Sequence, residues 1–82
     1  MVFVVTAHTK GNEYFCHIAT TMDLGVEWVK KFGNAWGGES CCFMIENSTI
    51  DKDTSFDTVT HIKYLTKDGE AVSLSEFINL KR

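Results

Sequence analysis

The chain of 82 residues has no proline, no internal repeat and no low-complexity tract. No stretch has the composition of a flexible linker, and a chain of this length forms one hydrophobic core. We therefore expect a single α+β domain that spans residues 1–82. Apolar residues make up 44% of the chain and charged residues 23%, a composition that is typical of a folded globular protein and excludes intrinsic disorder.

Cysteines are few and odd in number, which argues against a disulfide framework. Cys41 and Cys42 are neighbours, and a bridge between them would be strained and would leave Cys16 unpaired. Three free thiols indicate a reducing compartment, so we expect a cytoplasmic protein, or a host-cytoplasmic one if it is viral. Residues 1–6 lack a basic segment and are too short for a signal peptide or a membrane span, so no membrane association is expected.

Basic residues are also few. Eight basic residues stand against eleven acidic ones, the net charge is −3, and no more than two basic residues occur in succession. Because binding to a phosphate backbone needs clustered lysine and arginine, nucleic acid is a disfavoured partner. Two nucleic-acid alternatives stay open: weak binding by a sheet face that carries Phe3, Phe15 and Tyr64, or mimicry of nucleic acid by acidic residues.

The spacings that mark metal sites and nucleophiles are absent. His8, His17 and His61 fall on three expected strands, yet no C-x-x-C or H-x-x-x-H spacing occurs. Cys16 should point to the opposite face of its strand from His17. Cys42 has neither a Gly-x-Ser-x-Gly elbow nor a helix N-terminus around it. We therefore expect no enzyme activity, no cofactor and no metal, and a Cys/His-dependent enzyme or metal protein is the second alternative.

Hydrophobic periodicity predicts the secondary structure. A β-hairpin turning at Gly11-Asn12 should precede one long helix, two later strands and a short C-terminal helix that begins with the capping box Ser73–Glu76. The expected strands are residues 2–7, 14–19, 40–45 and 58–66, and the expected long helix is residues 20–36.

The long helix has a broad apolar face. Thr20 is its expected N-cap, and Gly37-Gly38 its expected end. Gly25 and Gly33 lie on the apolar side, where their cost in helix stability is best explained by close approach to a sheet. The other apolar residues on that side are Met22, Leu24, Val26, Trp28, Val29, Phe32 and Trp36.

These elements predict a mixed or antiparallel sheet of four to five strands packed on one long amphipathic helix. The strand at residues 2–7 is apolar on both faces, which suits an interior position in the sheet. The order and lengths of the elements resemble those of ubiquitin-like β-grasp domains. The resemblance is one of architecture and carries no sequence motif.

Acidic residues gather in one part of the chain. Residues 39–57 contain five acids and one lysine, which gives −4 and leaves +1 for the remainder. Asp51, Asp53 and Asp57 have part of the spacing of a calcium loop, but Phe56 replaces its glycine and Ile62 its terminal glutamate. The stretch 46–57 is long for a plain connection. It is either a solvated loop or an acidic patch that docks on a basic partner surface.

The function that this pattern favours is a small non-catalytic interaction module, an inhibitor or adaptor that binds another protein. A compact chain of this kind also fits a phage or mobile-element accessory protein that acts on a host factor. A homodimer, in which a second subunit covers an apolar strand, is the alternative partner. The residues predicted to bind the partner are Glu46, Asp51, Asp53, Phe56 and Asp57, with Trp36 as an aromatic anchor.

Overall fold

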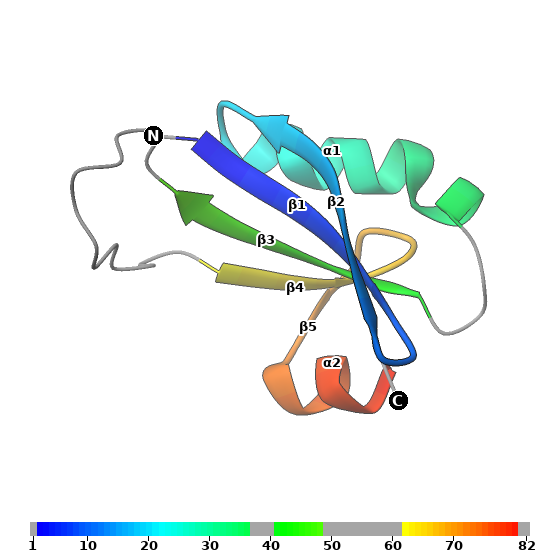
Figure 1. Ribbon diagram of the computed structural model, residues 1–82. Helices are drawn as coiled ribbons and strands as arrows, with labels where there is room; N and C mark the ends of the chain where they lie inside the picture. Colours follow the sequence, from blue (N-terminus) through cyan, green and yellow to red (C-terminus); the bar gives the residue numbers. More distant parts are fainter. Residues whose placement is uncertain (1, 37–40, 49–61, 81–82) are drawn as a thin grey trace.

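The computed structural model describes residues 2–36, 41–48 and 62–80, and the side chain of Trp36 lies outside this description. Strands, helices and one short 3-10 turn follow one another along the chain (Figure 1). They are β1 (Val2–Thr9), β2 (Asn12–Ala19), α1 (Met22–Phe32), the 3-10 turn η1 (Gly33–Trp36), β3 (Cys42–Ser48), β4 (Ile62–Thr66), β5 (Ala71–Val72) and α2 (Leu74–Leu80).

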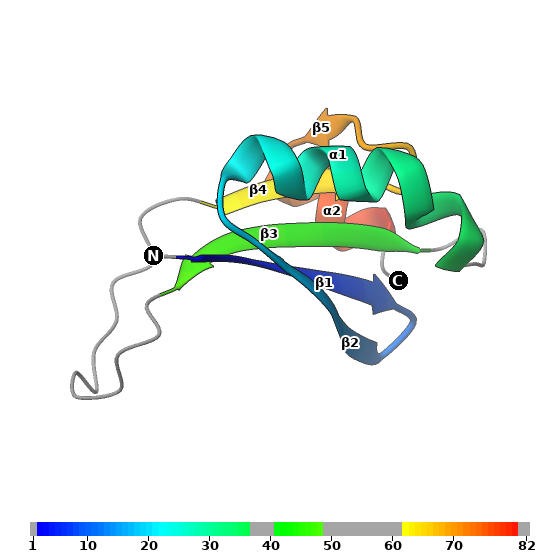
Figure 2. The same cartoon turned by 90° about the horizontal axis from the view of Figure 1, so that it is seen from above.

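The strands form one five-stranded antiparallel sheet in the order β2-β1-β3-β4-β5. The predicted α+β class is confirmed, and the two-sided apolar strand β1 does lie inside the sheet. Helix α1 covers one face and α2 the other, as Figures 1 and 2 show. The two edges of the described sheet are β2 and β5.

The larger core lies between α1 and the sheet. Alternate residues of β1, β3 and β4 point toward α1, because successive side chains of a strand face opposite sides. The buried residues of this core are Val5, Ala7, Val29, Cys41, Phe43, Ile45 and Leu65. On the other face Phe77 of α2 packs edge-on against His8, with ring centroids 5.1 Å apart, and lies 4.8 Å from the ring of Tyr64.

The two helix glycines are where α1 comes closest to the sheet. A β-carbon added at Gly25 would stand 3.1 Å from Cδ1 of Ile45, and one added at Gly33 would collide with the backbone carbonyl oxygen of Lys67. Gly25 and Val29 are the buried residues of α1. The close approach predicted from the glycines is therefore confirmed.

Several predicted boundaries were wrong by one to four residues, and β3 continues to Ser48 instead of ending at residue 45. The hairpin turns at Lys10-Gly11, where Gly11 has a left-handed φ of 72°, so Asn12 already belongs to β2 and faces Thr9. The N-cap of α1 is Thr21 instead of Thr20, and its hydroxyl oxygen accepts a 3.1 Å hydrogen bond from the backbone N–H of Leu24. The α-helix ends at Phe32, four residues earlier than predicted, because the chain tightens into the 3-10 turn.

At the C-terminal end, the cap of α2 is as predicted. The hydroxyl of Ser73 accepts a 3.2 Å hydrogen bond from the backbone N–H of Glu76. Strand β5 was missed, because two residues are too short for any periodicity to show. The predicted residues 58–61 of the fourth strand lie outside the described residues.

The contact at Gly33 predicts an asymmetry between the two glycines. Gly33→Ala should lower the free energy of unfolding by about 1–3 kcal/mol, because the backbone of Lys67 has to move. Gly25→Ala should cost less, since the tip of the Ile45 side chain can shift and alanine favours the helix by about 1 kcal/mol. Urea unfolding of both variants measures the difference, and equal losses would contradict this packing.

Candidate functional site

The two edges of the sheet are built very differently. Strand β5 has two residues and leads directly into α2. Strand β2 has eight residues and, within the described part of the chain, pairs with β1 alone. Among Asp, Glu, Lys and Arg, β2 contains Glu13 alone. A long edge strand with so little charge is the kind of strand to which another polypeptide can add.

A β-bulge lies in the middle of this edge. Val5 faces His17 and Thr6 faces Phe15, so Cys16 is the extra residue of β2. Cys16 packs against the core below α1, and His17 stacks on Trp28 of α1. The prediction that Cys16 and His17 point to opposite faces is therefore wrong, because the bulge turns both toward α1.

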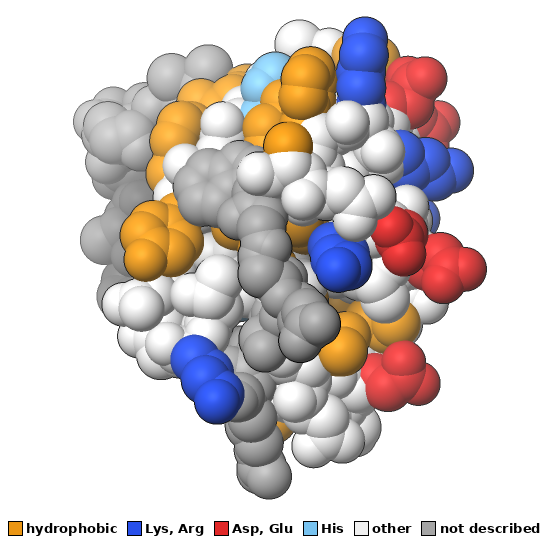
Figure 3. Space-filling view, turned by 90° about the vertical axis from the view of Figure 1, so that its right-hand side faces the viewer, with side chains coloured by type: hydrophobic (Ala, Val, Ile, Leu, Met, Phe, Trp, Pro, Cys, Tyr) orange, Lys and Arg blue, Asp and Glu red, His pale blue; other side chains and the backbone are white. Residues whose placement is uncertain are grey.

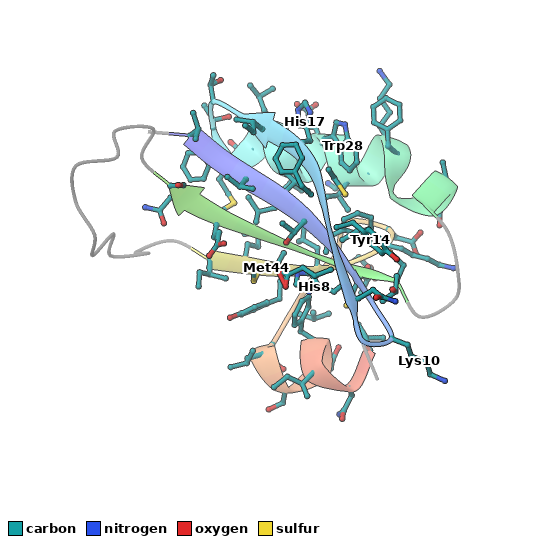
Figure 4. The ribbon with its side chains drawn as sticks, viewed as in Figure 1. His8, Lys10, Tyr14, His17, Trp28 and Met44 are labelled. Carbon is teal, nitrogen blue, oxygen red and sulfur yellow. The ribbon has the colours of Figure 1, made fainter. Side chains whose placement is uncertain are left out.

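The bulge also separates the histidines. His17 lies on the α1 side, whereas His8 faces Glu13 and contacts Phe77 on the α2 side (Figure 4). A turn at Gly11-Asn12 would have paired His8 with Phe15, and the turn at Lys10-Gly11 pairs it with Glu13 instead. His61 lies outside the described residues. Within those residues, no group of three His, Cys, Asp or Glu side chains is placed to hold a metal ion.

A groove of about 660 Å³ runs between β2 and α1. Its α1 wall is a row of Leu24, Trp28 and Phe32, spaced one helical turn apart. The Trp28 ring lies 5.3 Å from that of His17 at an interplanar angle of 9°, and 5.4 Å from that of Phe32. The groove is lined by His17, Ile18, Ala19, Thr20, Leu24, Glu27, Trp28, Lys30, Lys31 and Phe32.

The row was predicted to be part of the buried face of the helix, and the structure corrects this. Leu24 is 48% exposed and Phe32 43% exposed, while Trp28 is half-buried and also meets Phe43 of the core. Because α1 rests on the sheet through Gly25 and Val29, the bulkier row stands to one side, along the edge strand. Figure 3 shows hydrophobic side chains gathered around a histidine, with lysine beside them.

The opposite side of β2 is apolar as well. Phe15 is 62% exposed and Ile18 50% exposed, and they face Thr6 and Val4 of β1. Phe15 and Tyr64 lie on this α2 side of the sheet, but Phe3 packs against the core below α1. The three aromatic residues considered for nucleic-acid stacking therefore do not share a face, and Tyr64 is in contact with Phe77.

The predicted partner-binding residues are only partly described. Glu46 is half-buried on β3, where it faces Val4 and Ile62 on the α2 side of the sheet. Trp36 is the last residue of η1, and nothing further is described for its side chain. Asp51, Asp53, Phe56 and Asp57 lie outside the described residues, so the acidic site stays a prediction. The edge of β2 was not predicted as a site, although the low charge of residues 12–19 is a signal for it.

The cysteines are free thiols, and the surroundings of Cys16 and Cys41 disfavour the thiolate. Burial raises the pKa of Cys16, and nearby Cys41 acts in the same direction against a hydrogen bond with the backbone of Ala7. Burial also raises the pKa of Cys41, against the opposing charge of Lys67. Cys42 is buried beneath α2, where its thiol donates weakly to the backbone oxygen of His8. A nucleophilic cysteine has the opposite property, a lowered pKa.

These pKa directions predict slow alkylation. At neutral pH, Cys16 and Cys41 should react with iodoacetamide more slowly than a simple thiol, because a raised pKa leaves less thiolate. The alkylation rates of Cys16 and Cys41 should still increase with pH in a range where the alkylation rate of a simple thiol has become constant. Mass spectrometry of each cysteine over time measures this, with the urea-unfolded chain as control. A cysteine that reacts faster in the folded than in the unfolded chain would support the alternative of a nucleophilic cysteine.

No helix in the described part of the chain is long and apolar enough to cross a membrane. Comparison with known proteins finds no matching family model, no matching curated protein and no matching solved structure. The resemblance to β-grasp domains stays a prediction from the sequence, and none of these comparisons supports it.

Proposed function

We propose that this protein is a small non-catalytic interaction module that binds another protein by adding an extended segment of that partner to the sheet alongside β2. The observation that supports the proposal is the eight-residue edge strand with exposed apolar side chains on both sides and an apolar groove next to it. In strand addition, backbone hydrogen bonds supply affinity and the side-chain surroundings of the edge supply specificity.

The edge lacks most of the features that keep sheet edges from pairing. Proteins protect such edges with short strands, proline, lysine, a bulge or a covering element. Strand β2 is long and has neither proline nor lysine, and among the described residues the bulge is the one protective feature of this edge. The same protein protects its other edge by shortening β5 to two residues. The contrast within one sheet favours a binding role for β2.

Strand addition also explains how so small a chain can act without catalytic residues. A partner segment held along β2 is withheld from its other contacts, which is the action of an inhibitor, and a second surface would make the protein an adaptor. A cytoplasmic location, where three thiols stay reduced, and an origin as a phage or mobile-element accessory protein are parts of the same proposal.

The proposal predicts that one exposed apolar residue matters and another does not. Ile18→Lys on β2 should weaken capture of the partner from host lysate at least about tenfold, because it removes apolar contact and puts a charge on the edge. Leu74→Lys on α2 is the matched control, since Leu74 is 52% exposed and Ile18 50%. Quantitative pull-down with tagged protein measures both, and circular dichroism checks that each variant is folded.

Two results would contradict the proposal. A partner retained by Ile18→Lys and released by Leu74→Lys would place the site on α2. A partner retained by both variants but released when Asp51, Asp53 and Asp57 are reversed to lysine would support the acidic segment predicted from the sequence. Repeating the capture at low and moderate salt separates these cases further, because an acidic site loses affinity with salt more steeply than an apolar edge.

A further inference from the structure

A strand added at β2 would meet apolar surface on both of its faces. Its side chains would alternate between the two sides of the sheet. On the α1 side they would lie beside His17 and under the row of Leu24, Trp28 and Phe32. On the α2 side they would lie beside Phe15 and Ile18, which are the most exposed apolar residues of β2. A strand with alternating apolar and polar residues would cover only one of these surfaces.

The charges on the rim of the groove are unequal. Glu27, Lys30 and Lys31 of α1 are all exposed among its lining residues, which leaves an excess of one positive charge. The stem of Lys30, which also lines the groove, lies against Gly69 in the turn between β4 and β5. The ammonium of Lys31 lies 5.8 Å from the centre of the Phe32 ring, within the groove wall. Lys31 is therefore the cation that the structure places against the aromatic wall of the groove.

From these two observations we infer the chemistry of the partner segment, an inference that rests on the proposed function. The segment is an extended run of apolar residues on both faces, rich in β-branched and aromatic side chains, with an acidic side chain where it passes Lys31. β-Branched and aromatic residues are the ones that suit a strand packed on both sides. The acidic group pairs with Lys31 and fixes the register of the apolar run.

A second copy of this chain fits the edge less well. Antiparallel pairing of β2 with itself brings two bulges together in the middle of the new ladder, and each bulge leaves one residue unpaired. A foreign strand meets a single bulge and keeps regular pairing on either side of it. Such a self-pair also places Lys31 of both copies on the same face of the joined sheet, whereas Glu13, the acidic residue of β2, faces the α2 side.

The test is selection of a random twelve-residue peptide library, displayed on phage, against the full-length protein. We expect enriched peptides to contain at least four consecutive apolar residues next to Asp or Glu. Binding of a synthetic enriched peptide should be lost with Ile18→Lys and weakened about five-fold by Lys31→Glu, the effect of turning a surface attraction into a repulsion. Lys10→Glu is the matched control, because Lys10 is exposed at the tip of the hairpin (Figure 4).

Each other outcome overturns a separate claim. Peptides that depend on Ile18 but alternate apolar with polar residues, or carry basic residues, would overturn the inferred chemistry and leave strand addition intact. Peptides indifferent to Ile18→Lys, or no enrichment at all, would overturn strand addition itself. A dimer in sedimentation equilibrium that Ile18→Lys dissociates would assign the edge to a second copy, and the inferred partner segment would then be wrong.

Discussion

The contact between α1 and the sheet is made by residues with small side chains, and the position of the groove depends on it. Gly25 and Gly33 allow the helix backbone to come close to Ile45 and to the carbonyl of Lys67. Because the helix lies so close to the sheet, bulky side chains do not fit directly between the helix axis and the sheet. Trp28 and its neighbours in the row, Leu24 and Phe32, therefore lie toward β2. They form one wall of the groove there, and Trp28 also packs against the core.

Much of the fold could be predicted from the sequence, because its strongest elements carry clear local signals. Some elements require particular residue types, and those residues can be read directly in the sequence. Examples are the glycine of the hairpin turn, the apolar runs of β1 and β3, and the capping residue Ser73. The strand order and β5 could not be predicted in this way. Strand order depends on which strand edges meet in space, and β5, with two residues, is too short to show an alternation of apolar and polar side chains.

The candidate site could not be predicted for two further reasons. Tyr14, Phe15, Cys16, His17 and Ile18 are all apolar or aromatic, so no alternation reveals that the bulge shifts the register within β2. The helix is apolar over a broad arc, and periodicity alone does not say which part of the arc meets the sheet. The glycines were the signal, since the side that approaches closest is the side that carries Gly25, Val29 and Gly33.

The bulge in β2 does more than interrupt the ladder. At a sheet edge a bulge ordinarily discourages pairing, because it bends the strand and leaves a residue unpaired. Here it also directs Cys16 into the core and His17 onto Trp28, so the middle of the edge is tied to α1. An edge held in one conformation loses less entropy when a partner strand is added than a loose one does. Under the proposed strand addition, the feature that discourages indiscriminate pairing would therefore also prepare the edge for a segment whose side chains fit the groove.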